Sequence, residues 1–243
     1  MTYNVGAFGK EMDDSAPMVA RMIAEIGAET VALNELDSCN RRHGIDQAQH
    51  LADALNALVA EGQPRWSGWF GRAMAYAGGA YGNGIVTRAP VLDHFNIPLP
   101  REEGSEPRGC VVVETRHYVF AACHLDHIGK EARLVQARVL TEALQHRYGT
   151  GGKPVFLAGD FNDTPDSPLL RQLQRDWTRL SPLENSYPAK DPHSCIDYIF
   201  LLNNHASIRS VSGGAVTQFE SSDVTVASDH LPLYTEIRVF QMQ

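Results

Sequence analysis

The sequence predicts a four-layer α/β sandwich, in which two mainly antiparallel β-sheets pack face to face with helices outside. Short strand-like runs dominate, and the helical segments are interspersed among them rather than alternating strictly with them. A parallel Rossmann-type sheet requires that alternation and is the weaker interpretation. The 243 residues contain no low-complexity tract and no repeat of fixed period, so we expect a single domain over 1–243.

Four segments have apolar residues at helical spacing: 15–26, about 46–60, about 130–148, and one that begins at Ser167. Ser15 and Ser167 are the expected N-caps, each with a proline in the first helical turn behind it. Gly27 is expected to end the first helix, because glycine commonly follows the last helical residue.

Short apolar runs compatible with β-strands lie between the helices: 30–36, 85–87, 110–114, 118–123, 155–158, 196–202 and 233–240. A hairpin between 110–114 and 118–123, turning at Arg116 and His117, would set Cys110 opposite Cys123. We expect no disulfide there, because buried free cysteine is the commoner outcome in strands.

The composition argues against several classes of protein. A net charge of −8 and a pI near 5.6 do not favour non-specific binding of DNA. The four cysteines lack CxxC spacing, so structural zinc is not expected. No stretch approaches the roughly 20 apolar residues that span a bilayer, and the first residues lack a basic and apolar leader.

The strongest local motif is GDFND at 159–163, which follows an apolar run. An acid and an amide two residues apart project to the same side of an extended segment, so Asp160 and Asn162 can share one target. The same residues would serve equally well to close the strand with an Asx turn.

Two further motifs place acids at the ends of apolar runs. In SDH at 228–230, a histidine beside a carboxylate can be a general base, a phosphate ligand or a surface pair. In NELD at 34–37, the acids can be solvent caps of a strand, but oxygen ligands are also those that Mg²⁺ prefers.

The motifs HLDH at 124–127 and IDYIF at 196–200 are ambiguous when taken alone. His124 and His127 could contribute to a zinc site, yet no third protein ligand is evident nearby. Asp197 is a single carboxylate in an apolar strand. Because an unpaired buried charge is costly, we expect it to pair with a histidine or an arginine.

The order of the motifs is more informative than any one of them. The chain reads TYNV, NELD, YGNGIVTR, PRG, HLDH, GDFND, IDYIF and SDH. From Asn4 to His230 this order resembles the endonuclease/exonuclease/phosphatase superfamily, which includes DNase I, exonuclease III, neutral sphingomyelinases and inositol-polyphosphate 5-phosphatases. The resemblance implies a DNase I-like fold. It also implies a hydrolase dependent on Mg²⁺, or alternatively Mn²⁺, that cleaves a phosphodiester or phosphomonoester by in-line attack of water.

The resemblance assigns a metal site and a water site. Glu35 corresponds to the acid that binds the metal, with Asp229 near it. Asp160 and Asn162 correspond to the pair that holds or activates the attacking water and contacts the phosphate. We also find Gly6 where some relatives carry a further acid, which fits a site dominated by one metal.

Two histidines complete the catalytic set that the resemblance implies. His230 resembles the C-terminal catalytic histidine, and Asp197 the carboxylate that orients or charges it. His124 matches the second histidine of the DNase I-like branch, which binds phosphate or donates a proton to the leaving oxygen. A metal, a charged histidine and amide donors stabilise the negative charge of a phosphoryl transition state. Whether Asp160 or His230 is the general base stays open.

Three further residues are assigned to substrate binding. Asn4 resembles the family's amide near the metal and phosphate. Arg108 and Asn83 stand where the family tends to place phosphate-facing or supporting groups, although a solvated arginine and a glycine-flanked turn are the alternatives. Because the first strand begins almost at Met1, the chain looks trimmed upstream, for example after a leader. That leaves the compartment open, with an extracytoplasmic location as one option.

The substrate is the least determined property. A phosphorylated small molecule, a phospholipid headgroup and a nucleic acid all fit, although the acidic pI argues mildly against a non-specific duplex nuclease. We expect a monomer. One alternative is a catalytically inactive member that binds a phosphorylated ligand or a protein, which the complete set of site residues disfavours. A zinc hydrolase built on His124 and His127 ranks lowest.

Overall fold

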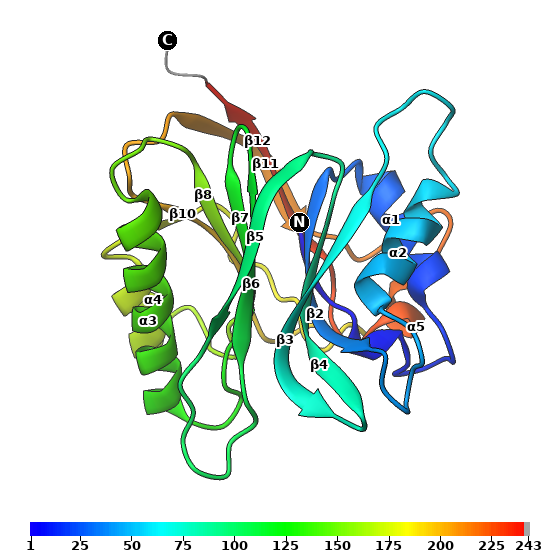
Figure 1. Cartoon of the computed structure of the whole chain (residues 1–243), viewed down its shortest axis with the longest axis horizontal. Coiled ribbons are helices and arrows are strands. Elements are labelled where there is room, and N and C mark those ends of the chain that lie inside the picture. The colour runs from blue at the N-terminus through cyan, green and yellow to red at the C-terminus, as the bar shows by residue number, and fades with distance from the viewer. Residues whose placement is uncertain (241–243) are drawn as a thin grey trace.

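Two six-stranded β-sheets form the centre of the molecule and pack face to face (Figure 1). The computed structural model describes residues 1–240. The first sheet has the order β11 (Ile208–Ala215), β12 (Leu233–Val239), β1 (Thr2–Asn4), β2 (Thr30–Ser38), β4 (Gly79–Thr87), β3 (Ser67–Tyr76). The second has the order β5 (Val91–Pro98), β6 (Gly109–Thr115), β7 (Val119–His124), β8 (Val155–Asp160), β10 (Asp197–Leu202), β9 (Trp177–Arg179).

Each sheet contains one parallel pair among antiparallel neighbours. The parallel pairs are β1 with β2 and β7 with β8, and each needs a crossover helix between its strands. The predicted sandwich of mainly antiparallel sheets is therefore confirmed. The hairpin β6–β7 pairs Cys110 with Cys123 as predicted, and both cysteines are free and buried.

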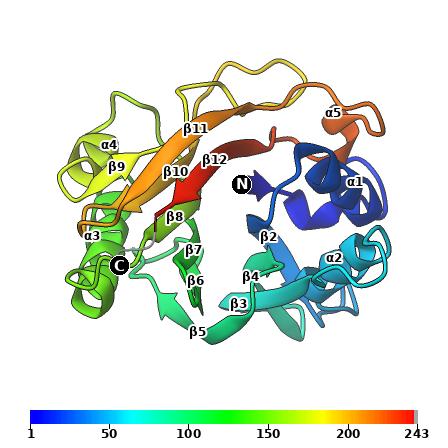
Figure 2. The same ribbon diagram turned by 90° about the horizontal axis from the view of Figure 1, so that it is seen from above.

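Helices cover the two outer faces. The first sheet is covered by α1 (Ala16–Ile26), α2 (Gln47–Asn56) and the short α5 (Val224–Ala227), and the second by α3 (Lys130–Tyr148) and α4 (Pro168–Leu173) (Figures 1 and 2). Apolar side chains fill the three interfaces between these four layers, as separate clusters between the sheets and under each helical layer. No helix within residues 1–240 is long and apolar enough to cross a membrane.

The helix starts were predicted better than the capping groups. Ser167 caps α4 as expected, since its Oγ accepts from a backbone N–H of the first turn. Ser15 occupies the N-cap position of α1, but its hydroxyl donates to the Ala227 carbonyl at 2.8 Å, and Asp14 accepts from the Ala16 N–H instead. The second helix is also shorter than expected, because it ends at Asn56 rather than near Ala60.

The two sheets contain the same succession of elements. The series β1–α1–β2–α2–β3–β4 corresponds to β7–α3–β8–α4–β9–β10, and each series forms four adjacent strands in the same order. Its central parallel strands end side by side, with Asn4 beside Asn34 in one sheet and His124 beside Asp160 in the other. Polar residues from both sheets therefore meet at one end of the sandwich.

Candidate active site

The predicted site residues gather where β1, β2, β7 and β8 end, and the amide of Asn4 lies at their centre. Its Nδ2 donates to Glu35 Oε1 at 3.1 Å and to Asp160 Oδ2 at 3.2 Å, and it lies 3.4 Å from His230 Nε2. Its Oδ1 accepts from the Gly6 N–H at 3.2 Å. Glu35, Asp160 and His230, which come from three distant parts of the chain, thus surround a single side chain.

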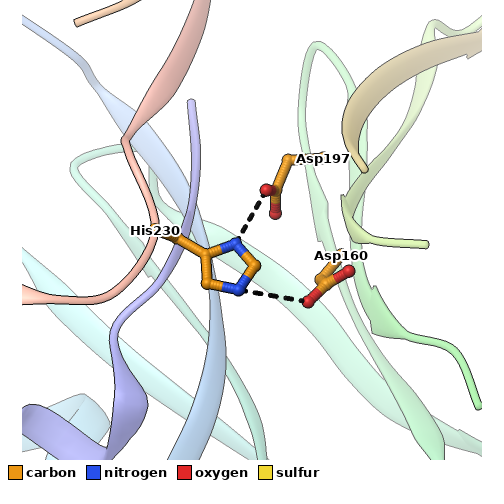
Figure 3. A group of neighbouring side chains, drawn as sticks. All are labelled: Asp160, Asp197 and His230. Carbon is orange, nitrogen blue, oxygen red and sulfur yellow. Dashed lines mark hydrogen bonds and ion pairs between the residues drawn. The ribbon is translucent and has the colours of Figure 1, made fainter. Parts of the chain in front are cut away.

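His230 stands between two carboxylates of the second sheet (Figure 3). Its Nδ1 lies 2.9 Å from Asp197 Oδ2, and its Nε2 lies 3.7 Å from Asp160 Oδ2. The expectation that the buried Asp197 pairs with a histidine or an arginine is met. Ser186 holds the same Asp197 oxygen in place by donating from its hydroxyl at 2.6 Å.

The surroundings favour a protonated His230 and weaken the acidity of Asp160. Burial lowers the pKa of His230, but the charge and hydrogen bond of Asp197, with the charges of Asp160 and Asp229, raise it to about 9. Burial and the charge of Asp197 raise the pKa of Asp160 to about 7, against the opposite effect of His230. A carboxylate with a pKa near 7 is well matched to proton transfer at neutral pH.

His124 lies on the other side of Asp160 and is held neutral. Its Nδ1 is 3.2 Å from Arg108 Nη1, and its Nε2 is 3.0 Å from Asn162 Nδ2. The Arg108 guanidinium can only donate, so Nδ1 is the acceptor of a neutral ring, while Nε2 also lies 3.5 Å from Asp160 Oδ2. Burial and the charges of Arg108 and His230 accordingly hold the pKa of His124 well below its usual value.

Arg108 and Asn83 are buried, so neither alternative considered for them from the sequence holds. Arg108 also contacts His127 Nδ1 at 3.0 Å, and a guanidinium between His124 and His127 opposes a zinc ion on these two rings. Asn83 lies inside β4, where Nδ2 donates to the Gly109 carbonyl at 2.8 Å and Oδ1 accepts from Asn34. Both polar atoms of Asn83 are thus engaged, Nδ2 across to the second sheet and Oδ1 within the first.

Local backbone irregularities place the acids. The β2–β4 register shifts between Leu33 and Leu36, and within this bulge Glu35 has φ of +60°. A bulge turns a side chain away from the regular alternation of a strand. In β8, Gly159 has φ of +150°, and a Cβ there would lie 1.8 Å from the Cys123 carbonyl oxygen. Only glycine lets β8 approach β7 this closely beside Asp160.

Oxygen ligands for a divalent cation converge on the first-sheet side of the site. Lys10 Nζ lies 3.0 Å from Asp229 Oδ2 and 3.6 Å from Glu35 Oε2, so a cationic group already stands between these two carboxylates. The second oxygen of Asp229 is buried and has no hydrogen-bond partner. Two part-exposed carboxylates, of which Asp229 has an oxygen without a hydrogen-bond partner, suit Mg²⁺ or Mn²⁺, so the residues present fit such an ion.

The buried group of Asp160, Asp197 and His230 is a less suitable place for a metal. Its three ligand atoms lie within 4.8 Å of one another. However, His230 Nδ1 is already bonded to Asp197, and Asp197 Oδ2 also accepts from the Ser186 hydroxyl, so these atoms are engaged within the protein. Glu35 and Asp229 are therefore the better candidates to hold such an ion.

Sequence reasoning missed Lys10, Ser186 and the role of Asn34. Asn34 Nδ2 donates to the Cys123 carbonyl at 2.8 Å, and its Oδ1 accepts from the Asp160 N–H at 3.0 Å, so it ties the two sheets together directly beneath the site. Its place in NELD was the available signal. Lys10 and Ser186 lie in loops without a motif, and only the folded chain brings them to the site.

Comparison with known proteins identifies the family. The model of the Endonuclease/Exonuclease/phosphatase family matches residues 1–230. The chain belongs to this family. Its members hydrolyse phosphate esters, and they are typically metal-dependent. At this level the chain is a hydrolase of the family, and the predicted DNase I-like sandwich is confirmed.

Among the relatives is the uncharacterized protein YbhP of Escherichia coli (strain K12), which is 27% identical over 237 residues, covering 92% of this chain and 88% of YbhP. The mannosyl-6-phosphatase Bt3783 of Bacteroides thetaiotaomicron superposes with a TM-score of 0.73 at 18% identity, covering 98% of each chain. D. rerio TDP2, complexed with a single-strand DNA product, superposes with a TM-score of 0.69 at 15% identity, covering 98% of this chain and 97% of TDP2. At these identities the likeness to the solved structures concerns the fold alone.

Proposed function

We propose that this chain is a phosphoesterase dependent on Mg²⁺ or Mn²⁺, which hydrolyses a phosphodiester or phosphomonoester by in-line attack of water. The observation that carries the proposal is the convergence of Glu35, Asp160 and His230 on the Asn4 amide. These residues supply a metal ligand, a base and an acid at one point. A binding-only member is not favoured, because none of the expected site residues is replaced.

Asp160 is the better candidate for the general base. Its pKa of about 7 leaves a usable fraction ionised at neutral pH, whereas His230, with a pKa of about 9, is already protonated there. His230 then donates a hydrogen bond or a proton to a phosphate or leaving oxygen, and Asp197 stabilises its charge. Asp160 accepts a proton from the attacking water, which Asn162 helps to hold.

His124 acts as a neutral hydrogen-bonding group in this scheme. With its pKa held well below the usual value, it has no readily released second proton at neutral pH, which disfavours the role of acid for the leaving oxygen. Glu35 and Asp229 would hold the divalent ion, with Asn4 beside them. Such an ion polarises a phosphoryl oxygen and offsets negative charge.

The test uses metal-free protein with Mg²⁺ or Mn²⁺ added back, and p-nitrophenyl phosphate and bis(p-nitrophenyl) phosphate as substrates. Wild-type protein is expected to hydrolyse one of the two, and EDTA to abolish the reaction. Asp160→Ala and His230→Ala should fold normally and lose about 10²- to 10⁴-fold in kcat. Asp176→Asn, a partly buried acid outside the site, is the control. Unchanged hydrolysis in both site variants would reject the proposal.

A further inference from the structure

A pocket of about 280 Å³ adjoins the proposed metal site and shares Lys10 and Glu35 with it. Its remaining wall includes Arg42, His43, Tyr76, Tyr81 and Glu106. The volume is at the small end of ligand sites, which run from about 300 to 1,000 Å³. An organic group attached to a phosphate bound beside Glu35 would be adjacent to this space.

The pocket is held rigid by a buried carboxylate that the proposed catalytic scheme does not use. Asp37, which follows Glu35 in NELD, has a fully buried side chain. Arg42 binds it through Nε at 2.7 Å and Nη2 at 2.9 Å, and His43 Nδ1 lies 2.6 Å from Oδ2. The side chains of Arg42 and His43 are therefore fixed in orientation, as in a preformed binding site.

The loop that carries these two residues is also tied down. The Asn40 carboxamide oxygen accepts from the Arg42 and His43 N–H groups, each at 2.9 Å. The Arg41 N–H donates to the Ala77 carbonyl at 2.9 Å, in the turn between β3 and β4. The loop that carries Arg42 and the β3–β4 hairpin thus form one wall of the pocket. Little conformational entropy would be lost in this wall when a ligand binds.

The lining favours hydroxyl groups over a planar base. The Arg42 guanidinium lies over the rings of Tyr76 at 4.9 Å and Tyr81 at 5.9 Å, so a ring face of each tyrosine is already covered. Burial and the charges of Glu35 and Glu106 raise the pKa of Tyr81, so its hydroxyl stays protonated. Phenol, imidazole, guanidinium and carboxylate groups offer donors and acceptors to an alcohol.

The charges of the lining disfavour a second anion. Arg42 is neutralised by Asp37, and Glu106 lies 2.9 Å from Arg108. Lys10 contacts Glu35 and Asp229. Among these residues, every cationic side chain that faces the pocket already has a carboxylate partner. None is left to offset the cost of desolvating a second phosphate there.

We propose that this pocket binds the organic group esterified to the scissile phosphate, and that this group is a compact uncharged polyol such as a sugar ring. The inference rests on the proposed phosphoesterase function and names its substrate class. The pocket is too small for a base pair and lacks the extended basic groove that tracks a nucleic-acid backbone.

The experiment compares a polyol ester with an aryl ester that presents no hydroxyl groups. Glucose 6-phosphate is paired with p-nitrophenyl phosphate, and glycerophosphoglycerol with bis(p-nitrophenyl) phosphate, with Mg²⁺ or Mn²⁺ present. If the wild type hydrolyses p-nitrophenyl phosphate, the monoester pair is used. If it hydrolyses bis(p-nitrophenyl) phosphate, the diester pair is used. Arg42→Lys retains the charge beside Asp37 but loses the planar fork, and Tyr81→Phe removes only a hydroxyl. Arg65→Ala, an exposed arginine outside the pocket, is the control.

We expect Arg42→Lys to lower the ratio of kcat/KM for the polyol ester to kcat/KM for the aryl ester by about tenfold or more, and Tyr81→Phe to lower it by roughly threefold to tenfold. Arg65→Ala should leave the ratio within about twofold. Melting temperatures near that of the wild type show that the variants fold.

Three results would overturn the inference while leaving the phosphoesterase function standing. The first is hydrolysis of the aryl ester without hydrolysis of the polyol ester, and the second is an unchanged ratio of kcat/KM values in both variants. The third is a wild-type preference for fructose 1,6-bisphosphate that Arg42→Lys abolishes, because it would show that the pocket binds an anion. If no ester is hydrolysed with either metal, the proposed function itself fails, and this inference fails with it.

Discussion

Replacing Asp197 by asparagine is expected to remove the raised pKa of His230. Asp197 is the largest contributor among the groups that raise this pKa, through its charge and its hydrogen bond to Nδ1 at 2.9 Å. Asparagine has nearly the same shape as aspartate but no charge. The effect of burial, which lowers the pKa of His230, then exceeds the remaining effects that raise it. The rise from 6.5 to about 9 corresponds to roughly 3 to 4 kcal/mol, at about 1.4 kcal/mol per pKa unit.

The same substitution changes how stability depends on pH. Because the folded pKa of His230 is raised, its contribution to stability is fully present below pH 6.5 and is lost as the pH rises through about 9. Asp160, with a pKa of about 7, is ionised above pH 8, so its contribution is constant there. Between pH 8 and 10 the free energy of unfolding of the wild type should therefore fall, and that of Asp197→Asn should fall less.

Two measurements on metal-free protein check this prediction. Imidazole resonances followed by NMR should give a midpoint near 9 for His230 in the wild type and at or below 6.5 in Asp197→Asn. Urea unfolding at several pH values gives the stability difference, with Asp176→Asn as the matched control. A midpoint that stays above 8 in Asp197→Asn would refute the reasoning, since it would show that another group sustains the charge of His230.

Three further predictions concern the metal site, a backbone contact and the cysteines. Lys10→Met is expected to bind Mg²⁺ about tenfold more tightly in calorimetry, because a competing cation leaves Glu35 and Asp229, and equal affinity would contradict this. Gly159→Ala should lower the free energy of unfolding in urea by about 3 kcal/mol, because of the 1.8 Å approach to the Cys123 carbonyl oxygen. Gly44→Ala, with nothing within 4 Å of its Cβ, should change it by less than about 0.5 kcal/mol, and similar values for both would remove the steric argument. A thiol reagent should modify only Cys39 in the native protein and all four cysteines after unfolding, because burial raises the pKa of the Cys110, Cys123 and Cys195 thiols. Rapid modification of a second cysteine in the native state would contradict that burial.

Much of the fold was predictable because the inner strands are continuously apolar and end in recognisable motifs. The long helix Lys130–Tyr148 was placed at both ends, and the hairpin register that sets Cys110 opposite Cys123 followed from its short turn. The edge strands β3, β5, β9 and β11 were not predicted. They are partly exposed and rich in polar or small residues, so their hydrophobic pattern is weak.

The residues that converge at the candidate site could be selected from the sequence, but the contacts between them could not. Motif order selected Glu35, Asp160 and His230, whereas the contact of Arg108 with both His124 and His127 depends on how β6 approaches β7. The bulge that aims Glu35 is a local departure from strand geometry, and hydrophobic alternation does not encode it. For the same reason Lys10, on a loop without periodicity, could not be assigned.

The division of the site between the two sheets has a consequence for partly denatured protein. Asn4, Glu35 and His230 belong to the first sheet and its loops, whereas Asp160 and Asp197 belong to the second. Mild denaturant that weakens the packing between the two sheets would separate these groups before any strand unfolds. Activity should therefore be lost at a lower denaturant concentration than the circular dichroism signal. The turnover rate would then report on the packing of the two sheets against each other.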